Sequence, residues 1–572
     1  MAKNKKQNQL AYLQMPLPEG RKYYKMTKRS WSGLNYRQVI DSGALSMEKN
    51  ISTSEAPYLV PSETFVIPEI VKNTITKEIP KYDIPIGLYG FGKYLVVLYR
   101  KSGNRRVYID FLEADSGGTL YVTRTGVVTT DNQYGDEPRT IVQFNAYDTV
   151  VNVNTGEYIK KLVIFPDAVS LYLDVEEIGS VNSDNIDSLS VSKMYYSTAD
   201  SYANDYIKIE YQQSSGGSYT RKVVPITSDE AGKFICDDIP EAPLNLKYAT
   251  VHQSRVFALS EDRIYASANN SYTRYLPTIN KEGESQEPWI STAQSNTKAD
   301  SVFTGITTFL NHVVCFKRGY MHEIYNSANP FKVQDIYAEG AVDHRTIQDV
   351  DGQLIFVSED GVKVYTGSNP RVIDYNLKSP RYKYAVSGTD GRFYYLYYEA
   401  SAGKRGFFTY DVMTEQWSEQ SVPNNEYMPE NEDNYVVNFA KTEDGMYMLC
   451  GDGKIYQLDS GNYNQVWSFE TDLITNETVD IKHVRKIQMF ADMRNNSEIS
   501  VYLLYDDEEF KEDEDFKQKH LVYSGSGEGR KAIRFKTRMT ANYGFKLHVE
   551  GKGYIRLYEA EIAVENGGEL FV

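Results

Sequence analysis

The sequence predicts an all-β fold, organised mainly as a β-propeller, and three observations carry this prediction. A strand–turn–strand phrase recurs along the 572 residues. Tyr is abundant, with 48 residues, and aromatic residues make up 13% of the chain, which favours packing across strands. Apolar and polar residues alternate over many short runs, and no segment longer than a turn or two has a convincing helical period.

The recurring phrase is an apolar run, a tight polar turn and an alternating run that ends in or near Tyr. This order is the signature of a β-hairpin. The copies lie roughly 40 to 60 residues apart, the period of propeller blades. We therefore expect about six or seven blades. The clearest copies are Arg255–Ala266, His312–Tyr325, Gln353–Tyr365 and Met446–Tyr456.

Departures from this rhythm divide the chain into five parts. Residues 1–80 hold several prolines and no steady period, which indicates an extended N-terminal arm with short strands. Residues 81–177 and 243–478 form the two parts of the propeller. Between them, residues 178–242 are rich in Ser, Asp and Tyr and are expected to form an inserted small β-domain. Residues 479–572 alternate cleanly, which predicts a C-terminal antiparallel β-sandwich.

Charge is unevenly distributed along the chain. The formal net charge of −16 argues against a general nucleic-acid-binding protein, which would need a basic surface. Residues 1–29, however, carry eight Lys and Arg residues against the single acid Glu19. An acidic body with a basic arm fits a protein that docks through its arm. The alternative is a disordered, solubilising tail.

Three cysteines, Cys236, Cys315 and Cys450, are far apart in the sequence. Two of them lie within apolar strand runs, so we expect buried free thiols and synthesis in a reducing compartment. No apolar run is long enough to predict a membrane span. The basic N-terminus lacks the continuous apolar segment of a secretory signal.

Several motifs resemble chemical sites but lack the required spacing. The acidic run 506–515 has neither the Gly nor the spacing of an EF-hand loop, so a solvated hairpin loop is expected. The segment Gly525–Lys531 does not match a phosphate-binding loop and is predicted to be a turn between strands. We therefore expect no cofactor.

The histidines and the turn carboxylates are further candidates for metal-binding or catalytic groups. His312 and His322 lie in one predicted hairpin, but packing is favoured over a zinc site. Asp360 and Asp452 follow apolar strands, and the surrounding residues depart from the sialidase repeat pattern, so both are interpreted as turn formers. The sequence offers no catalytic or metal-binding constellation, and we expect a protein that is not an enzyme.

With this order of elements established, the chain resembles the β-propeller tail proteins of short-tailed bacteriophages, called nozzle, tail hub or tail tubular protein B. The resemblance covers nearly the whole chain. One departure is Ser62-Glu63, where similar proteins often place an Arg. The segments that carry the resemblance are Gly33–Arg37, Gly43–Ser46, Lys49–Thr53, Ala56–Pro61, His252–Ser267, Lys317–Asn326, Ser358–Gly367 and Tyr410–Trp417, followed by the terminal sandwich.

The resemblance implies a non-enzymatic structural virion protein of the phage tail, synthesised in the host cytoplasm. Such proteins imply a homo-oligomeric ring, usually of six copies, that continues the DNA channel below the portal and adaptor and takes part in genome retention and ejection. The acidic balance agrees with this role, because an acidic lumen repels phosphate and lets DNA pass without specific binding. A head-to-tail ring needs two different faces on each subunit.

Within the arm, Trp31, Leu34, Tyr36 and Arg37 are predicted to contact neighbouring subunits, since buried Trp and Arg anchors often dominate interfaces. The equally supported alternative is that they pack on the subunit's own propeller. Two rival functions stay open. One is a carbohydrate- or receptor-binding propeller adhesin that uses exposed Tyr and Trp with the terminal sandwich. The other, which the sequence favours least, is a distant enzyme.

Overall fold

A computed structural model places most of the chain. The described residues are 13–16, 22–28, 31–35, 44–72, 80–129, 132–148, 157–173, 190–195, 207–212, 219–224, 232–239, 241–291, 302–336, 340–377, 382–400, 405–421, 435–458, 460–475, 481–505, 519–541 and 544–566.

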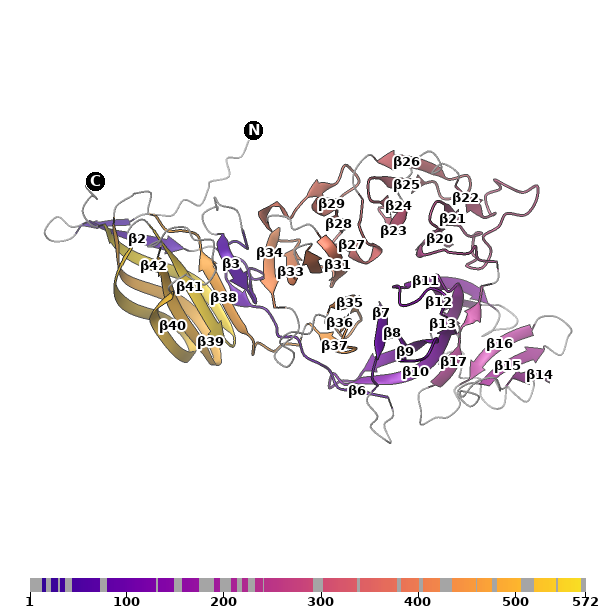
Figure 1. Ribbon diagram of the computed structural model, residues 1–572, viewed down its shortest axis with the longest axis horizontal. Helices are drawn as coiled ribbons and strands as arrows, with labels where there is room; N and C mark the ends of the chain where they lie inside the picture. The colour runs from indigo at the N-terminus through magenta and orange to yellow at the C-terminus, as the bar shows by residue number, and fades with distance from the viewer. Residues whose placement is uncertain are drawn as a thin grey trace.

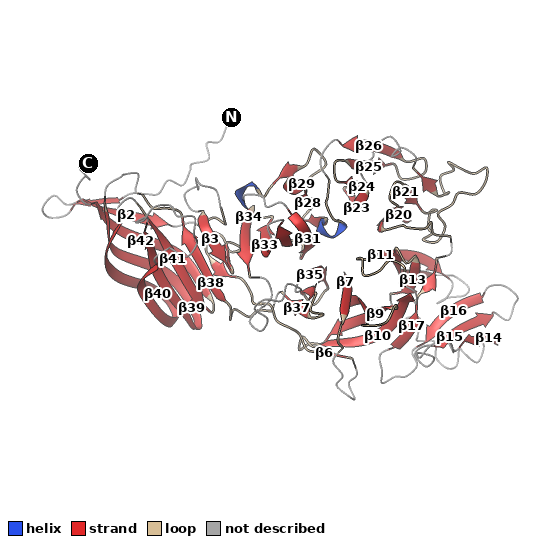
Figure 2. Cartoon of the chain, in the orientation of Figure 1, coloured by secondary structure: helices blue, strands red, loops and turns tan. Residues whose placement is uncertain are grey.

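The described residues form an all-β protein, as the sequence predicts (Figure 2). Within them the only helices are two 3-10 turns, η2 (His344–Thr346) and η3 (Tyr375–Leu377). None of the helical segments in this part of the chain has the length and apolar character needed to cross a membrane.

Seven sheets follow one another along the chain and lie around a common centre (Figure 1). Neighbouring strands pair antiparallel, except that β10 (Leu120–Thr129) also pairs in parallel with β6 (Ile70–Val71) and β17 (Gly232–Ile235). The first sheet contains β6 (Ile70–Val71), β7 (Ile84–Phe91), β8 (Tyr94–Arg100), β9 (Val107–Ala114), β10 (Leu120–Thr129) and β17 (Gly232–Ile235); the second contains β11 (Thr140–Asp148), β12 (Glu157–Phe165), β13 (Val169–Tyr172) and β18 (Asp237–Asp238).

The other five sheets repeat one meander of three or four strands. They are β19 (Tyr248–His252), β20 (Arg255–Leu259), β21 (Ile264–Ala266) and β22 (Trp289–Ile290); β23 (Phe303–Phe309), β24 (His312–Lys317), β25 (Met321–Tyr325) and β26 (Lys332–Ile336); β27 (Gln348–Val350), β28 (Gln353–Ser358), β29 (Gly361–Tyr365) and β30 (Arg371–Val372); β31 (Tyr382–Thr389), β32 (Phe393–Ala400), β33 (Arg405–Asp411) and β34 (Gln416–Gln420); and β35 (Val436–Lys441), β36 (Met446–Cys450) and β37 (Ile455–Gln457).

The apolar runs in the second strands follow from the packing of each sheet between two others. In β20, Val256 and Ala258 face a core shared with the second sheet, whereas Phe257 and Leu259 face a core shared with the fourth. A strand buried on both faces reads as a continuous apolar run, not as an alternating one. The same reason explains β24, in which every residue from His312 to Lys317 is buried.

The N-terminal segment and the C-terminal residues form one further sheet, beside the seven (Figure 1). Strand β2 pairs with β42, and β3 pairs with β38, so strands from both ends of the chain share a sheet and a core. This sheet contains β1 (Leu13–Pro16), β2 (Lys22–Lys28), β3 (Leu45–Lys49), β38 (Val466–Thr471), β39 (Lys482–Tyr505), β40 (Lys519–Ala541), β41 (Phe545–Lys552) and β42 (Ile555–Asn566); a two-stranded ribbon of β4 (Ile51–Ser52) and β5 (Val60–Pro61) lies next to it in the sequence.

The long hairpin of β39 and β40 bends at one corner. The pairing register shifts between Met493 and Ser497, and Asn495 and Asn496 adopt positive φ, as does Gly529 on the partner strand. Strand β42 pairs with the part of β39 before the bend, and β41 pairs with the part after it. Apolar residues from both halves meet in one core, as expected for a sheet folded over itself by a bulge.

The predicted boundaries differ from this arrangement at two places. Residues 1–80 are predicted as an arm separate from residues 479–572, but β2 and β3 complete the C-terminal sheet, which also includes β38 before residue 479. Part of the predicted insert, β14 (Ser190–Tyr195), β15 (Ile207–Gln212) and β16 (Tyr219–Val224), forms its own three-stranded sheet. The end of that segment, β17 and β18, instead extends the first two of the seven sheets.

Candidate functional site

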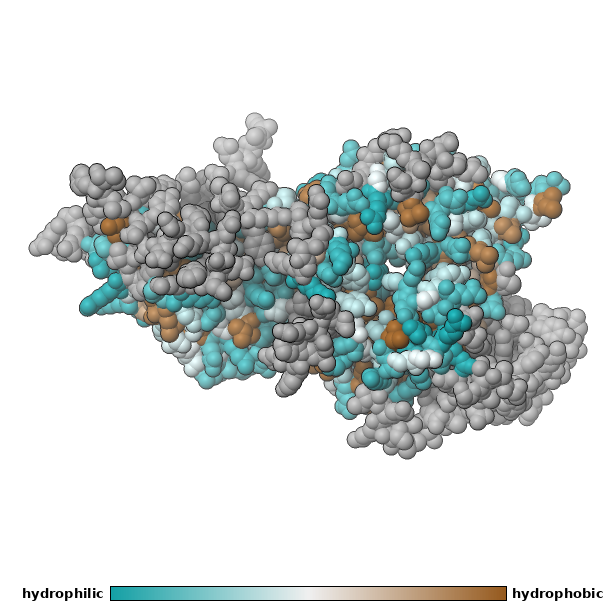
Figure 3. Space-filling model, in the orientation of Figure 1, coloured by the Kyte–Doolittle hydropathy of each residue, from teal (hydrophilic) through white to brown (hydrophobic). Residues whose placement is uncertain are grey.

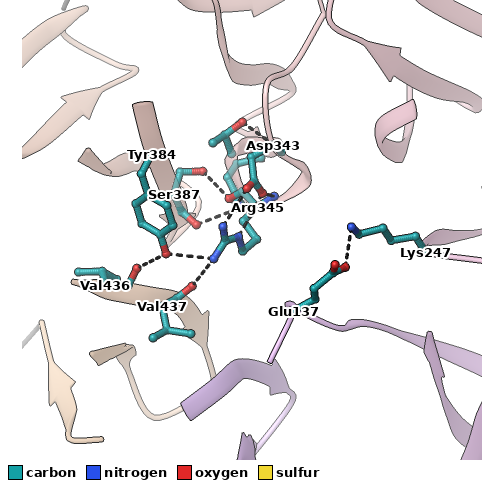
Figure 4. Close-up of polar contacts among 10 residues, drawn as sticks. Glu137, Lys247, Asp343, Arg345, Tyr384, Ser387, Val436 and Val437 are labelled. Carbon is teal, nitrogen blue, oxygen red and sulfur yellow. Dashed lines mark hydrogen bonds and ion pairs between the residues drawn. The ribbon is translucent and has the colours of Figure 1, made fainter. Parts of the chain in front are cut away.

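Polar side chains gather where the inner strands of three neighbouring sheets meet. The Arg345 guanidinium, in η2, donates to both carboxylate oxygens of Asp343, with Nε–Oδ1 at 3.1 Å and Nη2–Oδ2 at 2.8 Å. Its Nη1 also donates to the Tyr384 hydroxyl at 3.0 Å and to the Val437 carbonyl at 3.1 Å (Figure 4). One side chain thereby joins the turn before the fifth sheet to the sixth and seventh sheets.

The local sequence builds this arrangement. Asp343 has extended backbone and caps η2, and its carboxylate accepts a hydrogen bond from the Arg345 amide at 2.9 Å. The Ser387 hydroxyl on β31 donates to the Arg345 carbonyl at 3.1 Å, and the Tyr384 hydroxyl donates to the Val436 carbonyl at 2.8 Å. The Arg345 carbonyl and the Tyr384 hydroxyl are therefore both hydrogen-bonded across the boundaries between sheets.

Burial and charge set the protonation of these groups. Burial alone would raise the pKa of Asp343, but hydrogen bonds and charge from Arg345 hold that pKa below its usual value. Burial lowers the pKa of His344 to about 4 although the Asp343 charge opposes this shift, so its imidazole is neutral at pH 7. Burial raises the pKa of Tyr384. The cluster thus holds one fixed ion pair beside neutral rings.

A second group of ion pairs lies across from Arg345. The Lys247 ammonium is 2.7 Å from the Glu137 carboxylate, which links the start of the third sheet to the segment before β11 (Figure 4). Close to Glu137 in the sequence, Arg139 donates from Nε to Asp167 at 2.8 Å, and both of these side chains are buried. As at Arg345, both cations are directed at protein acceptors: Lys247 joins the third sheet to the second, and Arg139 holds together two parts of the second sheet.

The two histidines that the sequence places in one hairpin do not share a ligand. His312 Nε2 lies 3.4 Å from Glu323, and His322 Nδ1 lies 2.7 Å from Asp335. Within the described residues no group of three His, Cys, Asp or Glu side chains is placed to hold a metal ion. Both histidines are buried, and the His312 ring stacks on Tyr325 with ring centroids 4.9 Å apart.

Other sequence predictions have mixed outcomes. Asp452 forms the β36–β37 turn by accepting from the Lys454 amide at 3.0 Å, and all three cysteines are free and buried, as predicted. The prediction of a turn at Gly525–Lys531 is wrong, because these residues lie inside β40 and pair with β39 through the corner. The alternation of this segment was hidden by its glycines. The acidic run 506–515 lies outside the described residues.

The predicted arm contacts are placed only in part. Trp31 is buried and packs edge-to-face on Phe469 of β38, with ring centroids 5.4 Å apart. Leu34 is buried in a core of the fifth and sixth sheets, and its amide donates to the Trp417 carbonyl at 3.0 Å. Leu34 therefore packs on the seven-sheet array, as in the second of the two alternatives, whereas Trp31 packs in the core of the C-terminal sheet, which neither alternative names. Tyr36 and Arg37 lie outside the described residues.

Sequence reasoning missed a polar junction between the N-terminal segment and β34. The Asn50 amide donates to the Glu419 carbonyl at 2.8 Å, and its side chain donates to Ser421 Oγ at 2.8 Å and to the Val466 carbonyl at 2.7 Å. Asn50 has positive φ, a conformation that Asn tolerates well. In the sequence, the signal that could have indicated the junction is an Asn placed directly after a strand.

Glu48 lies in the same junction and is fully buried. Neither of its carboxylate oxygens has a hydrogen bond of good geometry, although the Ser418 hydroxyl lies near enough to favour the charged form. Burial raises the pKa of Glu48 well above its usual value, and the neighbouring Glu419 raises it further. The carboxyl is therefore held in its neutral form over part of the range in which exposed carboxyls are ionised.

Comparison with known proteins gives no family. No family model matches the sequence, and no curated protein matches it. Solved structures with some likeness include the extracellular domain of a candidate hybrid two-component system from B. thetaiotaomicron (TM-score 0.34, 8% identity, 74% of this chain, 43% of that chain). A candidate 6-phosphogluconolactonase from Bacteroides uniformis has TM-score 0.28 and 13% identity over 64% of this chain and 88% of that chain. The chain spans less than half the length of the first, and neither likeness is close enough to bear on function.

Proposed function

We propose that the seven sheets form a β-propeller and that the protein is a non-enzymatic structural component of a phage tail. In this proposal it is a nozzle or hub that assembles as a ring, continues the DNA channel below the portal and adaptor, and helps to retain and release the genome. The proposal rests on the tail-protein resemblance of the sequence together with the way in which the resembling phrases are used.

The observation that carries the propeller part of this proposal is the position of the repeat in its sheets. The four recurring phrases fall on the second and third strands of their sheets: β20–β21, β24–β25, β28–β29 and β36–β37. These are the third, fourth, fifth and seventh sheets, and a repeat that occupies the same place in several sheets is what a propeller requires. The hydrogen bonds of Arg345 to the sixth and seventh sheets, and the ion pair of Lys247 with Glu137, join neighbouring sheets, which favours a scaffold.

Deletion of the gene in the phage that carries it tests this function. Without the protein, filled heads should leak, so that their DNA becomes sensitive to added DNase and infectious particles are lost. Supply of the protein in trans should restore both. Particles that lack the protein and yet keep DNase-resistant DNA and infectivity would contradict the proposal.

A further inference from the structure

A set of exposed cations stands on the outer face of the C-terminal sheet, in a chain whose net charge is −16. On β40, residues alternate between the core and the outer face: Ile533, Phe535 and Thr537 are buried, whereas the three residues between and after them are exposed. Lys486 on the adjacent β39 is also exposed and lies directly opposite Lys536. This cationic face consists of Lys486, Arg534, Lys536 and Arg538.

The arrangement works against stability of the isolated chain. Like charges directly opposite each other on paired strands are destabilising, and Lys486 and Lys536 are such a pair. Across from Arg534 the β39 residue is Gln488, which cannot neutralise it. None of the four cations takes part in an ion pair found among the described residues. Arg485, next to Lys486 in the sequence, pairs with Glu565 of β42 at 2.8 Å.

Cations on an edge strand commonly protect a sheet against unwanted pairing. In the described part of the chain β40 pairs only with β39, so Arg534, Lys536 and Arg538 could serve that purpose alone. Lys486 could not, because β39 is an interior strand with β40 on one side and β42 on the other. The cationic face therefore extends beyond what protection of an edge explains.

Carboxylates gather on a different part of the molecule. The turns that join the first and second strands of the fifth, sixth and seventh sheets follow strands that contact one another. Gln348 of β27 donates from Nε2 to the Ser387 carbonyl of β31 at 3.2 Å, and Lys441 of β35 donates from Nζ to the carbonyl of Asp390 in the sixth-sheet turn. Two cations lie among them, Lys441 and Arg392, and Arg392 is paired with Asp411. These acidic turns contain Asp349, Asp351, Asp390, Glu443 and Asp444.

We propose that the cationic face of one copy of this chain binds the acidic turns of a second copy. The two surfaces have opposite charge and belong to different parts of the chain, the C-terminal sheet and the seven-sheet array (Figure 1). A contact between two different surfaces of identical subunits is heterologous and repeats head to tail, which closes a ring when the rotation permits. This inference rests on the proposed ring-forming function and names the surfaces that join its subunits.

Apolar side chains offer a weaker basis for such a contact. Figure 3 shows hydrophobic residues as scattered spots on a mainly hydrophilic surface, not as one continuous patch, over the described residues of that face. Scattered exposed apolar residues are normal for soluble proteins. Charge complementarity guides association and sets register, and it is the stronger basis for a contact between the cationic face and the acidic turns.

Sedimentation velocity of the purified full chain at low and high ionic strength tests the inference. We expect wild type to self-associate at low ionic strength and to dissociate as salt screens the charges. The variant R534E/K536E/R538E and the variant D351K/E443K/D444K should each associate at least about tenfold more weakly than wild type. An equimolar mixture of the two variants should associate again, because each supplies the charge that the other has lost.

The control variant K281E/K332E/K454E changes the net charge by the same amount as the first variant, at exposed lysines outside both surfaces, and should associate like wild type. Thermal unfolding confirms that each variant is folded. The inference is overturned if wild type stays monomeric at low ionic strength, if the control weakens association equally, or if the mixture does not associate. A monomer that instead binds duplex DNA through these cations would also overturn it. Loss of this contact leaves the tail function open, since that function is tested on virus particles.

Discussion

The Asn438 side-chain amide donates a hydrogen bond to the Leu88 carbonyl at 2.9 Å, across 350 residues of sequence. Asn438 lies on β35 of the seventh sheet and Leu88 on β7 of the first, so the bond joins the last sheet to the first. The Glu443 amide donates to the Gly92 carbonyl at 2.9 Å in the same seam. These contacts complete the circuit that the proposed propeller requires.

A substitution at Gly90 tests how closely the first and seventh sheets pack against each other. A Cβ atom at Gly90 would overlap the Lys441 carbonyl, a backbone group that can move only if β35 moves. Gly90→Ala should therefore lower the free energy of unfolding by about 1–3 kcal/mol, the range for overpacked sites. Gly319→Ala, at a glycine with open space around it, is the matched control and should have little effect in calorimetry. Equal effects of the two substitutions would contradict a tight seam.

Arg345→Met should destabilise the seven-sheet array. Removal of one partner of a buried ion pair costs about 3–5 kcal/mol, and we expect about 2–3 kcal/mol here because Asp343 partly reaches solvent. The double variant Arg345→Met with Asp343→Asn should lose less than the sum of the single losses, because no uncompensated charge is left. Calorimetry of the four proteins measures the coupling. Additive losses would show that the two residues act independently.

Trp31→Ala distinguishes the two alternatives for the N-terminal segment. If Trp31 acts through its contact with Phe469 in the core, the substitution should cost about 3–5 kcal/mol of stability. Met413→Ala, at an exposed apolar residue, should be nearly neutral. If Trp31 instead serves as a contact between subunits, Trp31→Ala would weaken self-association and leave thermal unfolding unchanged.

Glu48 gives the stability a defined pH dependence. Its pKa is raised in the folded chain, so its contribution is complete below the unfolded value of 4.5 and is lost as pH rises from there toward the folded pKa. Wild type should therefore lose stability over that interval relative to Glu48→Gln, which carries no charge. Glu443→Gln, at an exposed carboxyl, serves as the control. A difference between wild type and Glu48→Gln that does not change with pH would exclude this coupling.

Local sequence patterns predicted the hairpin strands correctly. The phrase that ends in Tyr365 pairs as β28 and β29, because an apolar run and an alternating run separated by a polar turn can satisfy their backbone groups only in a hairpin. The thiol of Cys315 lies inside such an apolar run, and its burial follows directly. The all-β class was therefore predictable from the sequence.

Pairing between distant segments was not predictable in the same way. Nothing near β2 or β3 in the sequence indicates that their partners are β42 and β38, since edge-to-edge pairing leaves no local periodic signal. The burial of Trp31 depends on that pairing. The alternation of Arg534, Lys536 and Arg538 is visible in the sequence, but the position of Lys486 opposite Lys536 depends on the pairing of β39 with β40.

The central claim is that the protein is a stoichiometric part of a phage tail. Quantitative peptide mass spectrometry on purified virus particles from the source tests it most directly. The account predicts peptides of this chain in every particle preparation, at a fixed ratio to the portal protein that survives further purification. Absence of the chain from purified particles, or an amount that falls with each purification step, would contradict the claim and favour the receptor-binding adhesin.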